Sequence, residues 1–206
     1  NPPRPLIWCW NINLDPLITV IGQRDGRIFR TFDEFVTEDS SIAENCDQVF
    51  DVYGRHRGEW LVYGDATGGN RTVQTAESSY NMIVKHMRPK GVVIRLRVPK
   101  TNPAVRDRVN SINHALMDEH RLVNVEVDPK CEELIADLEQ VQLDKRGGIR
   151  KVTNRSDPYY KRTHSSDAWS YWVAYEAPVV AQEPDARRGP IRVRDGSYAT
   201  HHAPRG

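Results

Sequence analysis

Three polar side chains stand where a divalent metal ion could be held. Asp65 directly follows 59–64, a short apolar run typical of a buried central strand, and a glycine pair comes soon after it. Asp167 falls in the first turn of the last expected helix, and Asn11 lies near the end of the first expected strand. Carboxylate oxygens are hard ligands that suit Mg²⁺ or Mn²⁺. Converging from separate elements, such oxygens can hold two ions roughly 4 Å apart for in-line hydrolysis of a phosphodiester.

Each of these residues also has a purely structural interpretation. Asp65 could cap a helix that begins near Val73, and Asp167 could serve the N-terminus of its own helix, where the dipole favours an acid. Asn11 could mark no more than a strand-to-turn transition. Taken singly, the motifs leave both interpretations open. Their order along the chain is what favours a shared site.

Hydrophobic periodicity indicates the elements that must position these residues. We expect strands over 6–13, 17–23, 27–35, 59–64, 91–98 and 121–127. We expect helices over 41–53, 73–86, 103–116, 129–141 and 164–177. Ser40 or Ser41 should cap the first helix. Three meandering strands followed by alternating helices and strands predict an α/β fold, a central mixed sheet with helices on both faces.

The length and composition of the chain suit one sizeable domain. With 206 residues, we expect a folded unit over 1–182 and a basic, flexible tail over 183–206, where arginines replace large apolar side chains. Net charge is +1, so any nucleic-acid surface must be local. The three cysteines lack CxxC spacing and are expected to be reduced. Neither a membrane span nor a signal peptide is indicated, and the missing initial Met suggests a domain excised from a longer protein.

Three motifs give the chain a resemblance to a known family. They are Asn-Ile-Asn-Leu-Asp-Pro at 11–16, Tyr-Gly-Asp-Ala-Thr-Gly at 63–68, and Thr-His-Ser-Ser-Asp-Ala at 163–168 followed by Tyr171. In this order and at these separations they resemble the C-terminal nuclease domain of the large terminase subunit of tailed bacteriophages. The resemblance covers roughly residues 5–180. It implies an RNase H-like fold and a metal-dependent endonuclease.

The resemblance also implies roles for individual residues. Asn11, Asp65 and Asp167 would be the catalytic metal ligands, holding two Mg²⁺ or Mn²⁺ ions. The family, however, has Asp where this chain has Asn11, and an uncharged amide is a poorer ligand for a hard dication. An engineered change that stops cleavage and a naturally weakened site both account for it; the intact surrounding motif favours the first. We therefore expect little or no cleavage by this chain.

Other residues are expected around that site. His164 could bind an ion, orient a carboxylate or contact a phosphate, and a histidine at a helix start more often supports the metal ligands than acts as one. Asp33 or Glu34 could supply a further acid, with surface placement favoured for at least one of the two. Phosphate contacts would come from Arg71 and from a basic turn over 145–151, whose alternative interpretation is a solvated charged hairpin. The basic side chains of that turn are Lys145, Arg146, Arg150 and Lys151.

By resemblance, the substrate is concatemeric double-stranded viral DNA, cut during genome packaging in the cytoplasm of the infected bacterial host. The partners would be the portal protein, the small terminase subunit and an upstream ATPase domain of the same polypeptide. A junction resolvase or transposase of the same fold remains an alternative. So does a catalytically dead module that docks DNA or the portal, which Asn11 favours.

Overall fold

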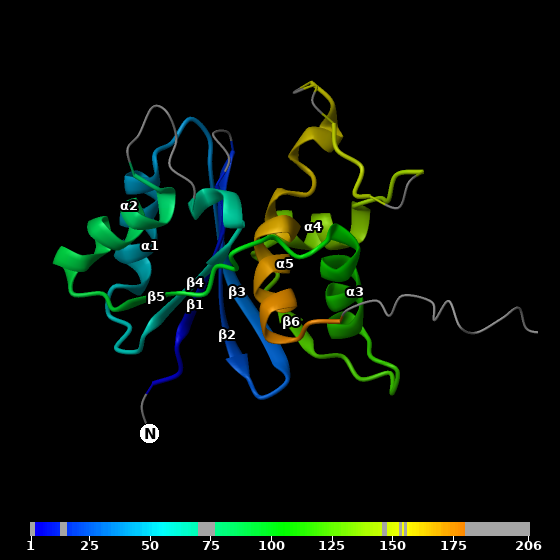
Figure 1. The fold of residues 1–206 in the computed structure, drawn as a ribbon, viewed down its shortest axis with the longest axis horizontal. Helices are drawn as coiled ribbons and strands as arrows, with labels where there is room; N and C mark the ends of the chain where they lie inside the picture. The colour runs from blue at the N-terminus through cyan, green and yellow to red at the C-terminus, as the bar shows by residue number, and fades with distance from the viewer. Residues whose placement is uncertain are drawn as a thin grey trace, which may run out of the picture.

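The protein, seen here in a computed structural model, is built on a six-stranded sheet (Figure 1). The structure describes residues 3–12, 16–69, 77–145, 148–152, 154 and 156–179. The expected tail over 183–206 and the boundary at 182 lie outside these ranges. The strands are β1 (Leu6–Asn11), β2 (Leu17–Asp25), β3 (Ile28–Thr37), β4 (Trp60–Gly64), β5 (Ile94–Leu96) and β6 (Val125–Val127).

The strand order is β5-β4-β1-β2-β3-β6, and the sheet is mixed. β1, β2 and β3 form the expected antiparallel meander, whereas β4 joins β1, β5 joins β4 and β6 joins β3 in parallel. The predicted α/β architecture is confirmed. Since β1 and β4 run in parallel with Trp10 paired to Gly64, the residues that follow each strand lie side by side at one end of the sheet.

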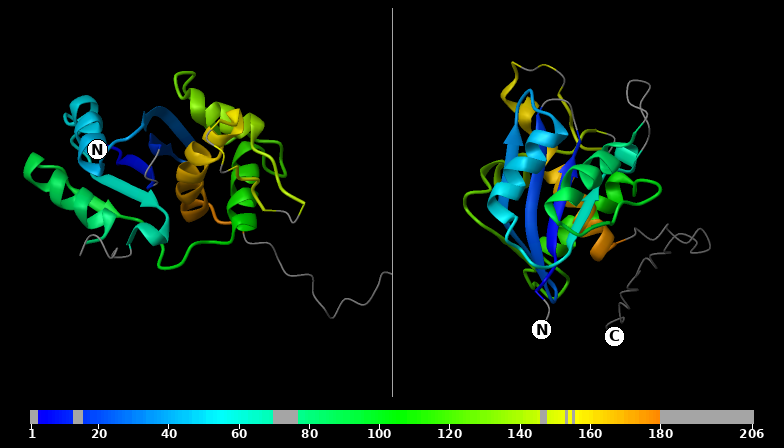
Figure 2. Two further views of the ribbon diagram at one scale, coloured as in Figure 1. Left: turned by 90° about the horizontal axis from the view of Figure 1, so that it is seen from above. Right: turned by 90° about the vertical axis from the view of Figure 1, so that its left-hand side faces the viewer.

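Helices cover both faces of the sheet (Figures 1 and 2). They are α1 (Ile42–Tyr53), α2 (Ser79–Met87), α3 (Val105–Leu116), α4 (Glu132–Gln140) and α5 (His164–Glu176). On one face, α1 and α2 cover a core that includes Trp8, Trp10 and Trp60. On the other, α5 lies against the sheet and packs Trp169 and Trp172 beside Cys9, with α3 and α4 outside it. β1 is therefore buried on both sides, its side chains alternating between two cores.

A bulge in β3 changes which side chains face α5. Thr31 pairs with Gly22 and Asp33 with Ile21, so Phe32 is an extra residue in this strand. The bulge reverses the alternation beyond it. Consequently Asp33 accepts a hydrogen bond from Tyr53 of α1, whereas Glu34 turns toward α4 and α5.

Several element boundaries differ from the expectation. β5 and β6 are only three residues long, because they are edge strands paired on one side. α2 begins at Ser79 and is capped by Ser78. The helix expected over 73–86 is therefore wrong at residues 77 and 78, and its first part, 73–76, lies outside the described residues. α4 begins at Glu132 rather than 129. Short 3₁₀ helices occupy Ala66–Gly69, Arg88–Lys90 and Pro158–Lys161.

The periodicity of 103–116 predicts a buried apolar stripe of Val105, Val109, Ile112 and Leu116 on α3, and this stripe is only partly covered. Val105 is 38 % exposed, and the helix instead buries Arg108, Ser111 and Ala115. The remaining stripe residues line a cavity of about 250 Å³ that also borders Asp167. The cause is that α3 turns a polar edge toward α5. Ser41 caps α1 in a capping box, and all three cysteines are buried free thiols, both as expected. None of the described helices has the length and apolar composition needed to cross a bilayer.

Candidate metal and nucleic-acid site

The ends of β1 and β4 bring Asn11 and Asp65 together. Asn11 continues the alternation of Ile7 and Cys9, whose side chains lie in the α5 core. Asp65 likewise continues the alternation of Leu61 and Tyr63 on that face. Strand periodicity and parallel pairing thus aim both side chains at α5.

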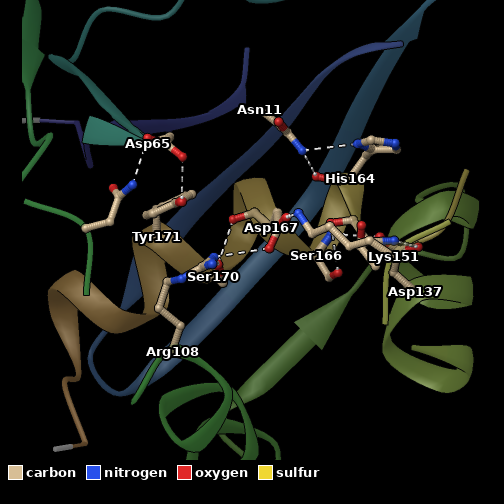
Figure 3. A network of polar contacts seen from close by, with 12 residues as sticks. Asn11, Asp65, Arg108, Asp137, Lys151, His164, Ser166, Asp167, Ser170 and Tyr171 are labelled. Carbon is tan, nitrogen blue, oxygen red and sulfur yellow. Dashed lines mark hydrogen bonds and ion pairs between the residues drawn. The ribbon is translucent and has the colours of Figure 1, made fainter. Parts of the chain in front are cut away.

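α5 carries the third position between the other two. His164, Asp167 and Tyr171 are three and four residues apart, so they share one face of the helix. Asn11 contacts His164 at the start of this face, and Asp65 contacts Tyr171 further along it (Figure 3). Asp167 lies between them. The three residues expected to form the site therefore converge on one helix face, although their role as ligands stays a prediction.

Asp65 is held by donors from three segments. Its Oδ1 accepts from the backbone N–H of Thr67 at 2.6 Å and from Asn102 Nδ2 at 2.8 Å. Its Oδ2 accepts from the Tyr171 hydroxyl at 3.0 Å. Partial burial opposes the charge, but these hydrogen bonds outweigh it and hold the pKa of Asp65 below its ordinary value. The side chain is thus an ionised, oriented carboxylate.

Asp167 has a different environment, because both of its oxygens contact cations. Arg108 Nη1 lies 3.2 Å from Oδ1, and Lys151 Nζ lies 2.8 Å from Oδ2. The Asp167 side chain is 11 % exposed. Figure 3 shows the two basic side chains reaching Asp167 from opposite sides. The charge of this carboxylate is therefore compensated within the chain.

Asn11 joins the end of β1 to the start of α5. Its Nδ2 donates to the carbonyl oxygen of His164 at 3.0 Å and lies 3.4 Å from the Nδ1 atom of the same residue. A carboxylate could not donate to that carbonyl, so the amide has a structural use here. Burial lowers the pKa of His164, which favours the neutral imidazole.

Two carboxylates support the helices around the site. Glu34 accepts from the backbone N–H groups of Glu133 and Leu134 at the start of α4, and from the Ser165 hydroxyl. Asp137 of α4 accepts from the N–H groups of Thr163 and Ser166 at the start of α5. Each acid satisfies helix donors that have no partner within their own helix. Glu34 thus contacts Ser165, two residues before Asp167, whereas Asp33 contacts Tyr53 and Lys130 on the other face of the sheet.

The basic turn lies beside this site. Leu143 pairs with Ile149 in an isolated antiparallel β-bridge. The Asp144 backbone N–H donates to the Gly148 carbonyl oxygen, and the Gly148 N–H donates to Asp144 Oδ1, so these two bonds close the turn. Lys145 is exposed, and the Arg150 guanidinium stacks on the Tyr159 ring at 4.7 Å. The Lys151 ammonium pairs with Asp167 although most of its side chain is exposed. Arg71 and Arg146 lie outside the described residues.

Three contacting residues had no predicted role: Arg108, Asn102 and Tyr171. Tyr171 stood in the third motif, four residues after Asp167, and helical spacing could have placed it on the same face. Arg108 lies next to the apolar stripe expected on its helix. A single charged residue in that position gives no indication that it will be buried. Asn102 directly precedes Pro103 and the helix expected over 103–116, a position that by itself indicates no more than a helix start.

The three positions offer a divalent ion two carboxylates and one amide. Their oxygens are hard ligands, which fits Mg²⁺ or Mn²⁺. In the described part of the chain, however, no three His, Cys, Asp or Glu residues are gathered closely enough to hold an ion. Asn11 explains one missing carboxylate, and Asp167 is bound to two cations. The residues therefore fit divalent metal in kind, with Asp65 as the carboxylate least opposed by neighbouring positive charge.

Comparisons with known proteins bear on the fold. No family model matches the sequence, and no curated protein matches it significantly. A large terminase from a thermophilic bacteriophage, solved with ATP-γ-S, superposes with a TM-score of 0.55 at 15% identity, covering 84% of this chain and 40% of the other. The nuclease domain of the P22 large terminase gives 0.50 at 14% identity, covering 85% and 81%. That of bacteriophage SPP1, with bound Mn, gives 0.47 at 19% identity, covering 81% and 84%.

This chain spans about two fifths of the length of the first of these terminases, and 81% of the P22 nuclease domain. At these identities the likeness concerns the fold. The chain has the fold of the large-terminase nuclease domains, which is RNase H-like, and the resemblance expected from the three motifs is confirmed at that level.

Proposed function

We propose that this chain is the nuclease module of a large terminase, a metal-dependent endonuclease that cuts double-stranded DNA. The observation that carries the proposal is the convergence of Asn11, Asp65 and Asp167 on one face of α5. These positions come from two strand ends and a helix start, far apart in sequence. A nuclease needs such convergence, because the reacting phosphate must meet several oxygen donors at once.

Asn11, Asp65 and Asp167 would hold the ions, two in the fully loaded site. When bound, Mg²⁺ or Mn²⁺ would activate a water molecule and stabilise the leaving oxygen. Asp65 is kept ionised and oriented by Thr67, Asn102 and Tyr171, so it needs little reorganisation. Lys145 and Arg150 would hold DNA phosphates beside α5 without reading bases. His164, neutral and next to Asn11, would orient that side chain.

The cellular setting follows from the same proposal. The substrate would be concatemeric viral DNA, cut in the cytoplasm of an infected bacterium during packaging. An ATPase domain of the same polypeptide, the portal protein and the small terminase subunit would be the partners. The terminase solved with ATP-γ-S, of which this chain covers 40%, supports the ATPase partner.

A second candidate is a DNA-binding module that does not cleave. Two observations favour it: position 11 carries no charge, and both oxygens of Asp167 are paired with Arg108 and Lys151. Such a module would use the basic turn to bind phosphates and leave the carboxylates idle.

A plasmid-nicking assay in Mn²⁺ or Mg²⁺ separates the candidates. Asn11→Asp should cut supercoiled plasmid, and chelator should stop the cutting, while the unsubstituted chain cuts little. Asn81→Asp, an exposed change on α2, adds the same charge elsewhere and should not cut. Adding Asp65→Asn to the Asn11→Asp chain should abolish the activity. If Asn11→Asp binds DNA and metal yet leaves the plasmid intact, the binding module is the better interpretation.

A further inference from the structure

The two cations on Asp167 differ in how easily they can leave. The Arg108 side chain is 8 % exposed, and its Nη1 also donates to the Ser170 hydroxyl at 2.6 Å. Its guanidinium lies 4.5 Å from the centre of the Tyr171 ring. Withdrawing this side chain would remove the only described cation on Asp167 Oδ1 and break up a buried ion pair, which costs considerable free energy. Arg108 is therefore a fixed part of the site.

Lys151 is the opposite case. Its side chain is 63 % exposed although its Nζ lies 2.8 Å from Asp167 Oδ2. An ammonium on a flexible stem that is mostly in water can exchange one anionic partner for another at small free-energy cost. Thus Oδ1 is permanently engaged by Arg108, whereas Oδ2 can be released.

Charge makes these contacts relevant to metal binding. Arg108 and Lys151 bring two positive charges to a single carboxylate. A divalent ion approaching Asp167 would meet both, and the mostly buried position screens their repulsion poorly. Asp65, by contrast, accepts hydrogen bonds from neutral donors only in the described contacts. A first ion therefore meets less opposition at Asp65 than at Asp167.

We infer that Lys151 occupies the Asp167 oxygen that a second divalent ion would need. The inference deepens the proposed nuclease function and rests on it. As folded, the site takes one ion, at Asp65; a second binds only when the Lys151 ammonium leaves Oδ2. Lys151 thus acts as an internal competitor of the metal.

The position of Lys151 suggests what removes it. It belongs to the basic turn that also carries Lys145 and Arg150, and it is the residue of that turn whose contact with Asp167 is described. A DNA phosphate is an alternative anionic partner for the ammonium. DNA that draws Lys151 away should tighten binding of the second ion, and by linkage the second ion should tighten DNA binding by the same factor. The second ion would then be taken up chiefly on substrate.

The test measures metal binding rather than cleavage. Mn²⁺ is titrated calorimetrically into the unsubstituted chain and into Lys151→Met, Lys151→Arg and Lys130→Met. Lys130 is a matched control, because it is 54 % exposed and pairs with Asp33 on the other face of the sheet. Thermal unfolding of each variant checks that the fold is kept.

Lys151→Met should bind a second Mn²⁺, or bind Mn²⁺ about fivefold more tightly, since an exposed pair is worth about 1 kcal/mol. Lys151→Arg and Lys130→Met should match the unsubstituted chain. A short duplex should strengthen Mn²⁺ binding to the unsubstituted chain but not to Lys151→Met.

Two results would overturn the inference, and they have different meanings. If all four chains bind Mn²⁺ with the same stoichiometry and affinity, Lys151 does not compete with metal, and the nuclease proposal survives. If no chain binds Mn²⁺ at millimolar concentration, and Asn11→Asp does not either, the metal-dependent nuclease itself is wrong.

Discussion

The Tyr171 hydroxyl donates to Asp65 Oδ2 across 3.0 Å, which links the second turn of α5 to the end of β4 over 106 positions of sequence. Tyr171 lies one helical turn after Asp167. The same ring also contacts Arg108, which binds Asp167. A single aromatic side chain therefore touches the environments of both carboxylates.

Tyr171→Phe should raise the pKa of Asp65 toward its ordinary value, because one of the hydrogen bonds that favour the charged form is lost. The variant should also lose about 1 kcal/mol of unfolding free energy at pH 7. A lowered folded pKa contributes stability above the unfolded pKa and loses it as pH falls through the folded pKa. The difference between the two chains should therefore vanish in strong acid.

Titration of the Asp65 carboxyl by carbon NMR and urea unfolding measure both effects. Tyr175→Phe is the control, because the Tyr175 ring lies on Tyr63 and Arg97 rather than on Asp65. An unchanged Asp65 titration in Tyr171→Phe would mean that this hydrogen bond is unimportant in solution.

Asp137→Asn should destabilise the fold by roughly 1–3 kcal/mol, because a buried group would lose a partner. Asp137 is 1 % exposed and accepts from two N–H groups at the start of α5. An amide offers only one acceptor oxygen and turns its NH₂ group toward the other donor. Urea unfolding measures the loss. Asp128→Asn, at an exposed acid that accepts from Lys130 N–H, should lose much less; equal losses would argue against a special role for Asp137.

Glu34→Gln should change how stability depends on pH. Burial raises the pKa of Glu34 above its ordinary value of 4.5, despite hydrogen bonds from Glu133 and Leu134. In the window from 4.5 up to the folded pKa, the folded state binds more protons than the unfolded state, so stability falls as pH rises. This contribution is fully present below the unfolded pKa and is absent from the Gln variant.

The unfolding free energy of the unsubstituted chain relative to Glu34→Gln should therefore decrease from pH 4 toward neutrality. Urea unfolding of both chains at several pH values measures this difference. A difference that grows with pH would show that the folded pKa lies below the unfolded one.

Gly64→Ala should displace the backbone segment that carries Asp65. A Cβ at this position would lie 2.3 Å from the Tyr80 hydroxyl and 2.9 Å from the Trp10 carbonyl oxygen. The Tyr80 hydroxyl donates to the Asp65 carbonyl oxygen at 2.8 Å, so its displacement would move the segment that carries the carboxylate. We expect a loss of about 1–3 kcal/mol in thermal or urea unfolding.

Gly69→Ala is the matched comparison, because a Cβ there would meet no atom of the described residues within 4 Å. It should leave stability almost unchanged. Similar losses in the two variants would show that crowding at Gly64 relaxes easily.

Much of the fold could be predicted, because β1, buried on both faces, is a continuous apolar run and the buried stripes of α1 and α2 are periodic. Short edge strands were less predictable: β5 and β6 pair along three residues each, so few side chains record their extent. The buried face of α3 could not be predicted from hydrophobic periodicity, since its innermost residues include the polar Arg108 and Ser111.

The sequence by itself determined the strand ends and the helix start that carry Asn11, Asp65 and Asp167, because those signals are local: apolar runs, turn residues and motif spacing. Only the tertiary structure decided what those side chains contact. The bulge at Phe32 turns Glu34 rather than Asp33 toward α5. Arg108 and Lys151 meet Asp167 from 59 and 16 positions away. Such pairings depend on how separate segments of the chain pack, and no single segment of sequence encodes the distance between them.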